Sequence, residues 1–204
     1  LPLDYLHERA AFDRGARFVV GLDEVGRGPW AGPVVACAAR LIGPAPAGLN
    51  DSKKLSAKKR EALYALIEAT AKVSIAHATV EEIDRLNILR ASHLAMERAV
   101  AGLPVQPDLA LIDGNMIPHG LSIPARAIVK GDGVSVSIAA ASIMAKICRD
   151  YVMWDLAQQC PGYGWETNAG YPSKSHKAAL QNLGVTAHHR RSFKPVHNIL
   201  YQEK

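Results

Sequence analysis

Four acidic residues stand at the ends of short apolar runs, where they could bind metal ions. Asp23 and Glu24 follow "FVVGL", Asp113 follows "LALI", and Asp132 follows "AIVKG". Ligands collect at the strand ends of α/β sheets, so we expect these carboxylates to converge. Converging carboxylates repel one another unless a cation lies between them. Mg²⁺ and Mn²⁺ prefer oxygen ligands, and two such ions could cleave a phosphodiester in this site.

Ordinary turns offer an alternative explanation for two of these acids. Asp113–Gly114 and Asp132–Gly133 are Asp-Gly pairs, and Asp-Gly is a strong turn signal. Taken singly, each of the two aspartates fits a turn better than a metal site. Only the recurrence of acids at three strand ends favours metal binding.

A glycine-rich loop, "GRGPWAGP", directly follows the first two acids. Gly26-Arg27-Gly28 is not a dinucleotide-binding fingerprint, because Pro29 and Pro33 prevent the helix that must follow one. The absence of a G-K-[ST] sequence excludes a nucleotide-binding P-loop. The glycines instead allow the backbone to approach a ligand closely, with Arg27 beside it. A glycine turn with a solvated arginine is the alternative.

Aromatic and basic residues elsewhere suit a nucleic acid. Tyr171 precedes the rigid Pro172 and could stack on a sugar or a base, or simply close a turn. The basic run at 188–194, "HHRRSFK", is fit to contact phosphates. Lys53 and Lys54 lie near a predicted helix start, where they could hold a phosphate or remain exposed.

Hydrophobic periodicity and turn residues predict alternating strands and helices. Ser56 is expected to cap one helix, and Thr79 with Glu82 forms a capping box for another. The predicted strands cover 17–23, 34–41, 72–79, 108–115 and 125–133, and the predicted helices cover 57–71, 80–102, 135–159 and 174–183. The alanine-rich helix 135–159 could lie close against a sheet. This order predicts an α/β fold, a mixed sheet flanked by helices, as a single domain over 1–204.

The net charge of +5 is concentrated at one end of the chain. Residues 160–204 carry six Lys or Arg against Glu166 and Glu203, a net +4. We expect 160–204 to be a small, irregular or helical basic extension that binds a polyanion, although a solvated basic surface is the simpler alternative.

Cysteine usage and hydropathy exclude other classes of protein. Three widely spaced cysteines without a C-x-x-C pair argue against a disulfide framework and against a cysteine-based zinc site. The longest small-apolar run, "SIAAASIMA", is far shorter than the roughly 20 residues that span a bilayer. No segment reads as a signal peptide. We therefore expect a cytoplasmic protein without a membrane partner.

With these motifs assembled, the chain resembles the ribonuclease HII family almost from end to end. The resemblance rests on seven motifs in order: "GLDEVGRGPWAGPVV", "NDSKKLS", "EEIDRLNIL", "LIDGN", "VKGDGVSVSIAAASIMAKICRDY", "NAGYPSKSH" and "HRRSF". It implies a ribonuclease H-like fold and a four-carboxylate site for Mg²⁺ or Mn²⁺. It also implies cleavage of RNA in RNA–DNA duplexes, and nicking of DNA 5′ to a single embedded ribonucleotide, with 3′-hydroxyl and 5′-phosphate products.

The resemblance assigns roles to individual residues. Asp23, Glu24, Asp113 and Asp132 correspond to the four catalytic, metal-binding carboxylates. The backbone of Gly26-Arg27-Gly28 corresponds to the loop that reads the ribose 2′-hydroxyl, and Tyr171 to the tyrosine that packs on the nucleotide at the RNA–DNA junction. Asp150 is a rival for the fourth ligand and ranks below Asp132. Pro29-Trp30 departs from the pattern, in which leucine usually follows.

Our mechanistic hypothesis is two-metal hydrolysis by a monomer, with Asp23 bridging the ions. Lys53, Lys146, His176 and Arg190 are weaker candidates for contacts to the flanking phosphates. One rival reading is a non-catalytic nucleic-acid-binding module that has lost its metals. Another is a metal-dependent DNA nuclease on a related fold, for which the loop and the tyrosine would have no evident use.

Overall fold

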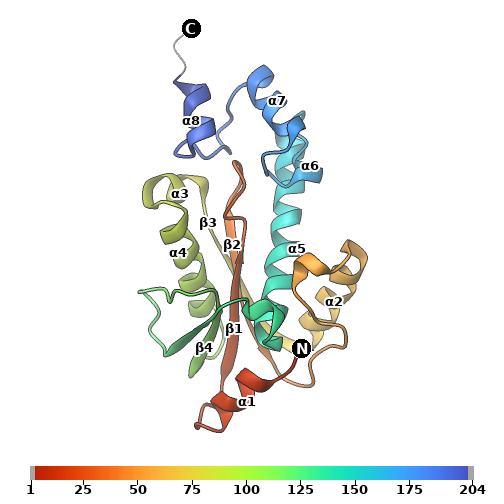
Figure 1. Ribbon diagram of the computed structural model, residues 1–204, viewed down its shortest axis with the longest axis vertical. Helices are drawn as coiled ribbons and strands as arrows, with labels where there is room; N and C mark the ends of the chain where they lie inside the picture. The colour runs from red at the N-terminus through yellow and green to blue at the C-terminus, as the bar shows by residue number, and fades with distance from the viewer. Residues whose placement is uncertain (1–2, 202–204) are drawn as a thin grey trace.

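A computed structural model describes residues 3–201, which form a five-stranded mixed sheet with helices on both faces (Figure 1). The strands are β1 (Val19–Val25), β2 (Val34–Leu41), β3 (Ala71–Ala78), β4 (Leu109–Asp113) and β5 (Ala125–Ile128). The helices are α1 (Leu6–Phe12), α2 (Ala57–Thr70), α3 (Val80–Leu86), α4 (Ile88–Ala101), α5 (Val136–Gln159), α6 (Trp165–Asn168), α7 (Lys174–Leu183) and α8 (Lys194–Leu200). Two 3₁₀ turns, η1 (Ser52–Lys54) and η2 (Gly131–Gly133), complete the elements.

The strand order β3-β2-β1-β4-β5 places β1 at the centre of the sheet. β1 pairs with β2 as an antiparallel hairpin, and β2 pairs with β3 in the same way. β4 and β5 run parallel to β1, in a register that pairs Leu22 with Ile112. The carboxyl ends of β1 and β4 therefore meet at one edge of the sheet, which is where two of the predicted acids lie.

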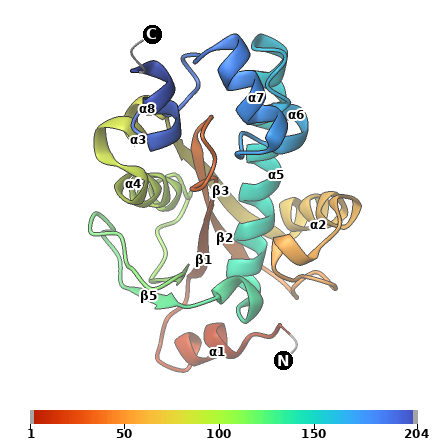
Figure 2. The ribbon, with the colours of Figure 1, turned by 45° about the horizontal axis from the view of Figure 1, so that its top comes forward.

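Helix α5 packs closely on one face of the sheet, together with α2, while α3 and α4 cover the other face (Figures 1 and 2). Small side chains allow the close approach: the α5 residues Ala139, Ala140 and Ala141 are fully buried, as the sequence predicts. A Cβ added to Gly21 of β1 would lie 2.0 Å from the carbonyl carbon of Ser137. Only glycine permits this contact, so β1 and α5 form one rigid support.

The C-terminal helices α6, α7 and α8 gather beyond the tip of the β1–β2 hairpin, which lies between α7 and α8 in both views (Figures 1 and 2). They have a hydrophobic cluster of their own, with Trp165, Leu180 and Val196 packed against Ala31 of the glycine-rich loop. The C-terminal layer and the loop thus share one core.

Three expectations about the bounds of the elements are wrong. β1 continues beyond the predicted end at Asp23 to include Glu24 and Val25, because antiparallel pairing with β2 continues through them. Strand β5 ends at Ile128, since Lys130 adopts a left-handed conformation (φ 55°) and places Asp132 in η2. The predicted helix 80–102 is broken at Asn87 (φ 69°), whose side chain caps α4. The segment 160–204, expected to be irregular or helical, contains α6, α7 and α8, the last with proline in its first turn.

Helix α1 was not predicted from the sequence. Its cap residue Tyr5 makes no side-chain capping hydrogen bond that could have signalled it. Over the described part of the chain, none of the helices has the length and apolar character required to cross a bilayer.

Candidate active site

Two of the acids meet where the central strands run side by side. The parallel register that pairs Leu22 with Ile112 brings the next residues, Asp23 and Asp113, together at the edge of the sheet. Asp23 is buried, and its Oδ1 accepts a hydrogen bond of 2.7 Å from the backbone N–H of Glu24. Asp113 Oδ1 accepts one of 2.6 Å from Gly131 N–H, which ties β4 to the η2 turn.

Glu24 projects to the α4 side of the sheet, because successive strand residues point to opposite faces. Its Oε1 lies 3.4 Å from Nη1 of Arg27. Glu24, Arg27, His93 and Asp113 line a hollow of about 140 Å³ beside α4. The first acid pair and the start of the glycine-rich loop are therefore in direct contact.

Asp132 lies on the other side of Asp113, in a hollow of about 380 Å³. Lys53 Nζ approaches its Oδ2 at 3.9 Å, and Asp51 lines the same hollow. Asp51 caps η1 by accepting a hydrogen bond of 2.9 Å from Lys53 N–H. Asp113 lines both hollows and so connects Glu24 with Asp132, while the strand register places Asp23 beside Asp113.

The acids disturb one another electrostatically. Burial raises the pKa of Asp23 well above its usual range, and the charges of Glu24 and Asp113 raise it further. Burial also raises the pKa of Glu24, against the opposing effect of Arg27. The pKa of Asp132 is raised by burial and then by Asp113, with Lys53 opposing the shift. Three of the four acids are therefore destabilised as anions.

This donor set fits a hard divalent cation. Within residues 3–201 no three Asp, Glu, His or Cys side chains already converge closely enough to enclose an ion. Glu24 and Asp132 are instead paired with the basic side chains of Arg27 and Lys53, which are 49% and 83% exposed. The ligands are all carboxylate oxygens, and a cation would relieve the repulsion that raises their pKa values. The acids thus fit Mg²⁺ or Mn²⁺.

Two buried guanidinium groups hold the glycine-rich loop from behind. Arg190 donates hydrogen bonds to five loop carbonyls, those of Gly26 (2.6 Å), Arg27 (3.0 Å), Pro29 (2.8 Å), Gly32 (2.9 Å) and Pro33 (3.2 Å). Arg149 of α5 donates to Ala31 (3.1 Å), Pro33 (2.9 Å) and Ala169 (2.9 Å). Both side chains are completely buried. With its carbonyls turned inward, the loop has a fixed conformation.

Tyr171 stands over this loop. A Cβ added to Gly28 would lie 3.3 Å from Cε1 of Tyr171, so any side chain at position 28 would crowd the ring. Tyr171 is 44% exposed, so a ligand can reach it. Its backbone carbonyl lies 2.9 Å from Nδ1 of the buried His176, whose Nε2 accepts a hydrogen bond from Trp165. The histidine therefore positions the tyrosine.

The four predicted phosphate contacts have different environments. Lys53 lies exposed beside Asp132, as a phosphate contact requires. Lys146 Nζ is 2.6 Å from Oδ1 of Asp150, and neither residue lines the two acidic hollows. His176 and Arg190 are fully buried against other protein groups. A positioning role fits them in place of the direct phosphate contact that the sequence suggested.

Three residues of this region were missed by the sequence analysis. Asp51 lies in the motif "NDSKKLS", in which only the lysines were considered as contacts to a ligand. His93 is 6% exposed on α4, and its Nδ1 has no hydrogen-bond partner among the described residues. Arg149 lies within the long helix, and the sequence does not distinguish it from an arginine on the surface. Only the tertiary structure shows that it supports the loop.

The mixed sheet and the adjoining carboxylates define the class, a metal-dependent nuclease with a ribonuclease H-like fold. Comparison with known proteins agrees. Residues 20–196 match the family model described as Ribonuclease HII. Ribonuclease HII from Ruegeria pomeroyi is 69% identical over 98% of this chain and 86% of its own length. The protein of the same name from Cereibacter sphaeroides is 68% identical over 98% and 95%.

Solved structures share the fold. Ribonuclease H2 from Pyrococcus horikoshii has a TM-score of 0.73 and 26% identity over 90% of this chain and 97% of its own. A Bst-RNase HIII in complex with Mn²⁺ has a TM-score of 0.75 at 23% identity, covering 94% of this chain and 71% of its own. The chain belongs to the ribonuclease HII family. It is a metal-dependent ribonuclease that cleaves the RNA strand of RNA–DNA hybrids.

Proposed function

We propose that this enzyme also nicks DNA 5′ to a single embedded ribonucleotide, leaving 3′-hydroxyl and 5′-phosphate ends. The observation that supports it is the direct contact between the acids and the glycine-rich loop. Arg27, the middle residue of the loop motif, reaches Glu24 at 3.4 Å. A sugar recognised by this loop therefore lies within the length of one side chain from the acids. At this spacing the enzyme can select the phosphodiester bond next to the recognised sugar.

Asp23, Glu24, Asp113 and Asp132 would hold two Mg²⁺ or Mn²⁺ ions. When bound, such ions activate a water and neutralise the charge of the leaving 3′ oxygen. The protein contributes a rigid frame: Asp23 is fixed on the central strand, and Asp113 is fixed by the Gly131 amide. Lys53, next to Asp132, is the best placed of the lysines to contact a phosphate beside the scissile bond.

Discrimination would come from the backbone of Gly26-Arg27-Gly28 and the ring of Tyr171. The 2′-hydroxyl both donates and accepts hydrogen bonds, and it is the group that separates RNA from DNA at one nucleotide. The carbonyls of Gly26 and Arg27 are taken up by Arg190. The amide side of the loop is consequently the side left for a ligand. The tyrosine ring over Gly28 supplies a wall for the sugar.

The basic segment 160–204 would hold the duplex. Of its six Lys and Arg, four are exposed in the described residues: Lys174, Lys177, Arg191 and Lys194. Lys174 and Lys177 belong to α7 and Lys194 to α8, and these two helices flank the tip of the β1–β2 hairpin, next to the glycine-rich loop (Figure 2). We propose that one copy of the chain suffices for this binding, and that the enzyme works in the cytoplasm.

The test is cleavage of an end-labelled DNA duplex that carries one ribonucleotide, beside an all-DNA duplex and an RNA–DNA hybrid. Each is incubated with Mg²⁺, with Mn²⁺ or with chelator. One metal-dependent cut 5′ to the ribonucleotide, and none in all-DNA, is the expected result. Equal cutting of both DNA duplexes would refute the sugar reader, and binding without any cutting would favour the non-catalytic module.

Two variants separate catalysis from recognition. Asp132→Asn should abolish most cleavage of every substrate while the protein stays folded. Tyr171→Ala should reduce cleavage at the single ribonucleotide more than cleavage of the hybrid, which offers many contacts. Unchanged selectivity in the tyrosine variant would remove Tyr171 from the reader.

A further inference from the structure

A separate hollow, lined by basic residues, lies at the end of the sheet opposite the acids. It has a volume of about 710 Å³ and lies between α1 and the first residues of β4 and β5. Leu109 begins β4, whereas Asp113 ends it. Arg17 precedes Asp23 by six residues of extended chain, which at about 3.3 Å each places the hollow about 20 Å from the acids. It is therefore separate from the site described above.

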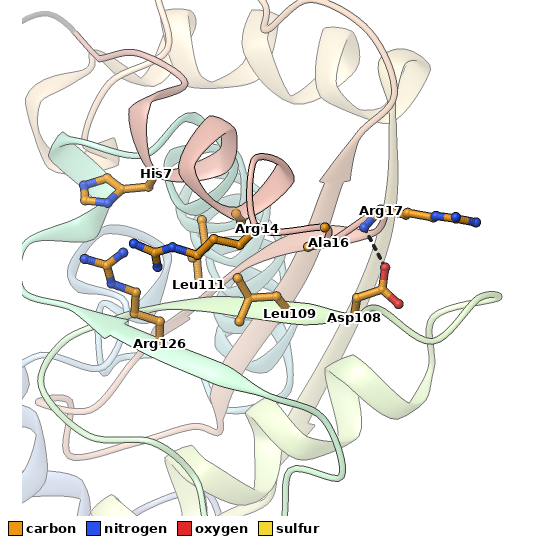
Figure 3. A pocket seen from close by; sticks show the side chains of 10 residues that line it. His7, Arg14, Ala16, Arg17, Asp108, Leu109, Leu111 and Arg126 are labelled. Atoms are coloured by element: carbon orange, nitrogen blue, oxygen red, sulfur yellow. Dashed lines mark hydrogen bonds between the residues drawn. The ribbon is translucent and has the colours of Figure 1, made fainter.

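Basic side chains from two elements face this hollow. Arg14 and Arg126 both line the hollow, and Figure 3 shows their side chains on the same side of it as His7. Arg17 extends in the opposite direction. Among residues 3–201, no carboxylate lies within ion-pair distance of Arg14 or Arg126. Two like charges that line one hollow without a counter-ion attract an anion.

The one acid lining the hollow does not neutralise these arginines. Asp108 is, among the described residues, the only carboxylate of the lining, and it lies across the hollow beside Arg17 (Figure 3). Its Oδ2 accepts hydrogen bonds from the backbone N–H groups of Arg17 (2.7 Å) and Phe18 (2.9 Å). These bonds lower the pKa of Asp108 and anchor the start of β1.

The chemistry of the pair favours phosphate over carboxylate. One guanidinium already satisfies both oxygens of a carboxylate, whereas the three free oxygens of a phosphate ester can accept from two guanidinium groups at once. The floor of the hollow is apolar, with Leu109, the buried Leu111 and the buried Ala11. Hollows of this volume hold small molecules with a nonpolar body.

We propose that this hollow binds a phosphate ester of about nucleotide size, with the phosphate between Arg14 and Arg126 and the nonpolar part over Leu109 and Leu111. The phosphate could belong to a free nucleotide or to the backbone of a nucleic acid strand. Binding here does not use the carboxylates or the glycine-rich loop, so it is independent of the proposed cleavage specificity.

The test is isothermal titration of the full chain with AMP, inorganic phosphate and adenosine in turn. AMP should bind at one site, more tightly than inorganic phosphate, and adenosine should bind weakest. Arg14→Gln and Arg126→Gln should each weaken AMP binding at least tenfold, since each removes charge-assisted hydrogen bonds to the phosphate. Arg9→Gln is the matched control, an exposed α1 arginine outside the lining, and should bind AMP normally.

Two outcomes would overturn the proposal: no AMP binding at millimolar concentration, or binding that both Gln variants retain. Competition with an all-DNA duplex identifies the source of the phosphate. Displacement of AMP by the duplex, weakened in the two variants, assigns the hollow to strand backbone, whereas simultaneous binding assigns it to free nucleotides. Hybrid cleavage without AMP should be unchanged in both variants, and its loss would refute the independence from the active site.

Discussion

The buried carboxyl group of Asp23 lowers the stability of the folded protein and is suited to bind a cation. It is buried on the central strand, beside Glu24 and Asp113, and its pKa is raised well above the usual range. A carboxyl group with a raised pKa in the folded state is more easily ionised when the chain unfolds. Its contribution to folding therefore falls as the pH rises from the ordinary pKa of aspartate to the raised pKa of the folded state. At neutral pH the charge destabilises the protein.

Replacing Asp23 by Asn should accordingly stabilise the metal-free protein at pH 7.5. We expect the free energy of unfolding in urea to rise by about 1 kcal/mol, the usual size of a point-mutation effect, because burial and repulsion no longer act on a charge at this position. Mg²⁺ should raise the melting temperature of the wild type and not that of the variant. Asp155→Asn, an exposed acid of α5, should change neither quantity. A less stable Asp23→Asn protein would contradict the account of repulsion.

The convergence of the acids could be predicted from the sequence, but their surroundings could not. Asp23, Glu24 and Asp113 were singled out because an acid beside an apolar run is a local signal. Asp132 was singled out for a partly wrong reason, since it lies in a turn four residues beyond the end of β5. His176 and Arg190 were misassigned, because burial depends on contacts between residues distant in the chain.

At the scale of elements, the glycine-rich loop owes its shape to side chains from elsewhere in the chain. Arg190 supplies hydrogen bonds to five loop carbonyls, and Arg149 holds the same loop from α5. Burial lowers the pKa of Arg190 to about 9 and that of Arg149 to about 10. Both remain charged at neutral pH. Backbone dipoles compensate these charges in the way that carboxylates usually do.

Arg190→Met keeps the length of the side chain and removes every one of these bonds. Stranding buried carbonyls costs about 1–3 kcal/mol each where water cannot replace the donor, so we expect a loss of about 3 kcal/mol or more in urea unfolding. The loop should also loosen, and the KM for a single-ribonucleotide duplex should rise.

The neighbouring Arg191 provides the control. Its side chain is exposed, so Arg191→Met should alter stability by less than about 0.5 kcal/mol. Equal losses in the two variants would show that Arg190 does not support the loop.

The elements were largely predictable where a signal is local. The strands β1 and β2, the capped helix α2, the capping box that begins α3 and the alanine-rich α5 all follow from alternation, caps and small residues. The break at Asn87 was not, because hydrophobic periodicity continues across it. The backbone of Asn87, at φ 69°, ends α3, and its side chain caps α4.

At the scale of the whole molecule, the pair His176 and His189 makes the stability of the C-terminal layer depend on pH. Nδ1 of His176 can donate only to the Tyr171 carbonyl, so its Nε2 must accept from Trp165 and from His189. Nδ1 of His189 then accepts from the backbone N–H of Thr186 (3.0 Å). This chain of hydrogen bonds requires both imidazoles to be neutral.

Acid should therefore weaken the fold through His189. Burial, and then the charges of His176 and His188, lower its pKa to about 3, against an ordinary value near 6.5 in the unfolded chain. The unfolded state binds the proton first, so the stabilisation is complete above pH 6.5 and is lost as the pH falls towards 3. By pH 5 the loss is about 2 kcal/mol.

Urea unfolding of the wild type and His189→Asn at pH 7.5 and pH 5 measures this effect. The variant should be less stable at pH 7.5 and should lose less stability between the two values. The acids of the active site respond in the opposite sense in both proteins, so the difference isolates the histidine. Parallel changes in the two proteins would show that His189 does not titrate in this way.

Charge at the same end of the molecule should govern affinity for the duplex. Lys177 Nζ lies 5.8 Å from the ring centre of Trp30 in the glycine-rich loop, and Lys174 begins the same helix. Each lysine that neutralises a phosphate releases counterions. The logarithm of the binding constant therefore falls with the logarithm of the salt concentration by about 0.9 for each contact.

Lys174→Gln/Lys177→Gln should accordingly reduce that slope by about 2, measured by fluorescence anisotropy with a labelled hybrid in chelator. Lys58→Gln/Lys59→Gln carries the same charge change on the exposed surface of α2 and should leave the slope unchanged. If both doubles lowered the slope equally, overall charge would explain the affinity. A loss confined to the α7 double means that the helix beside Tyr171 lies on the phosphates, so the same end of the molecule holds the duplex and presents the ribonucleotide to the acids.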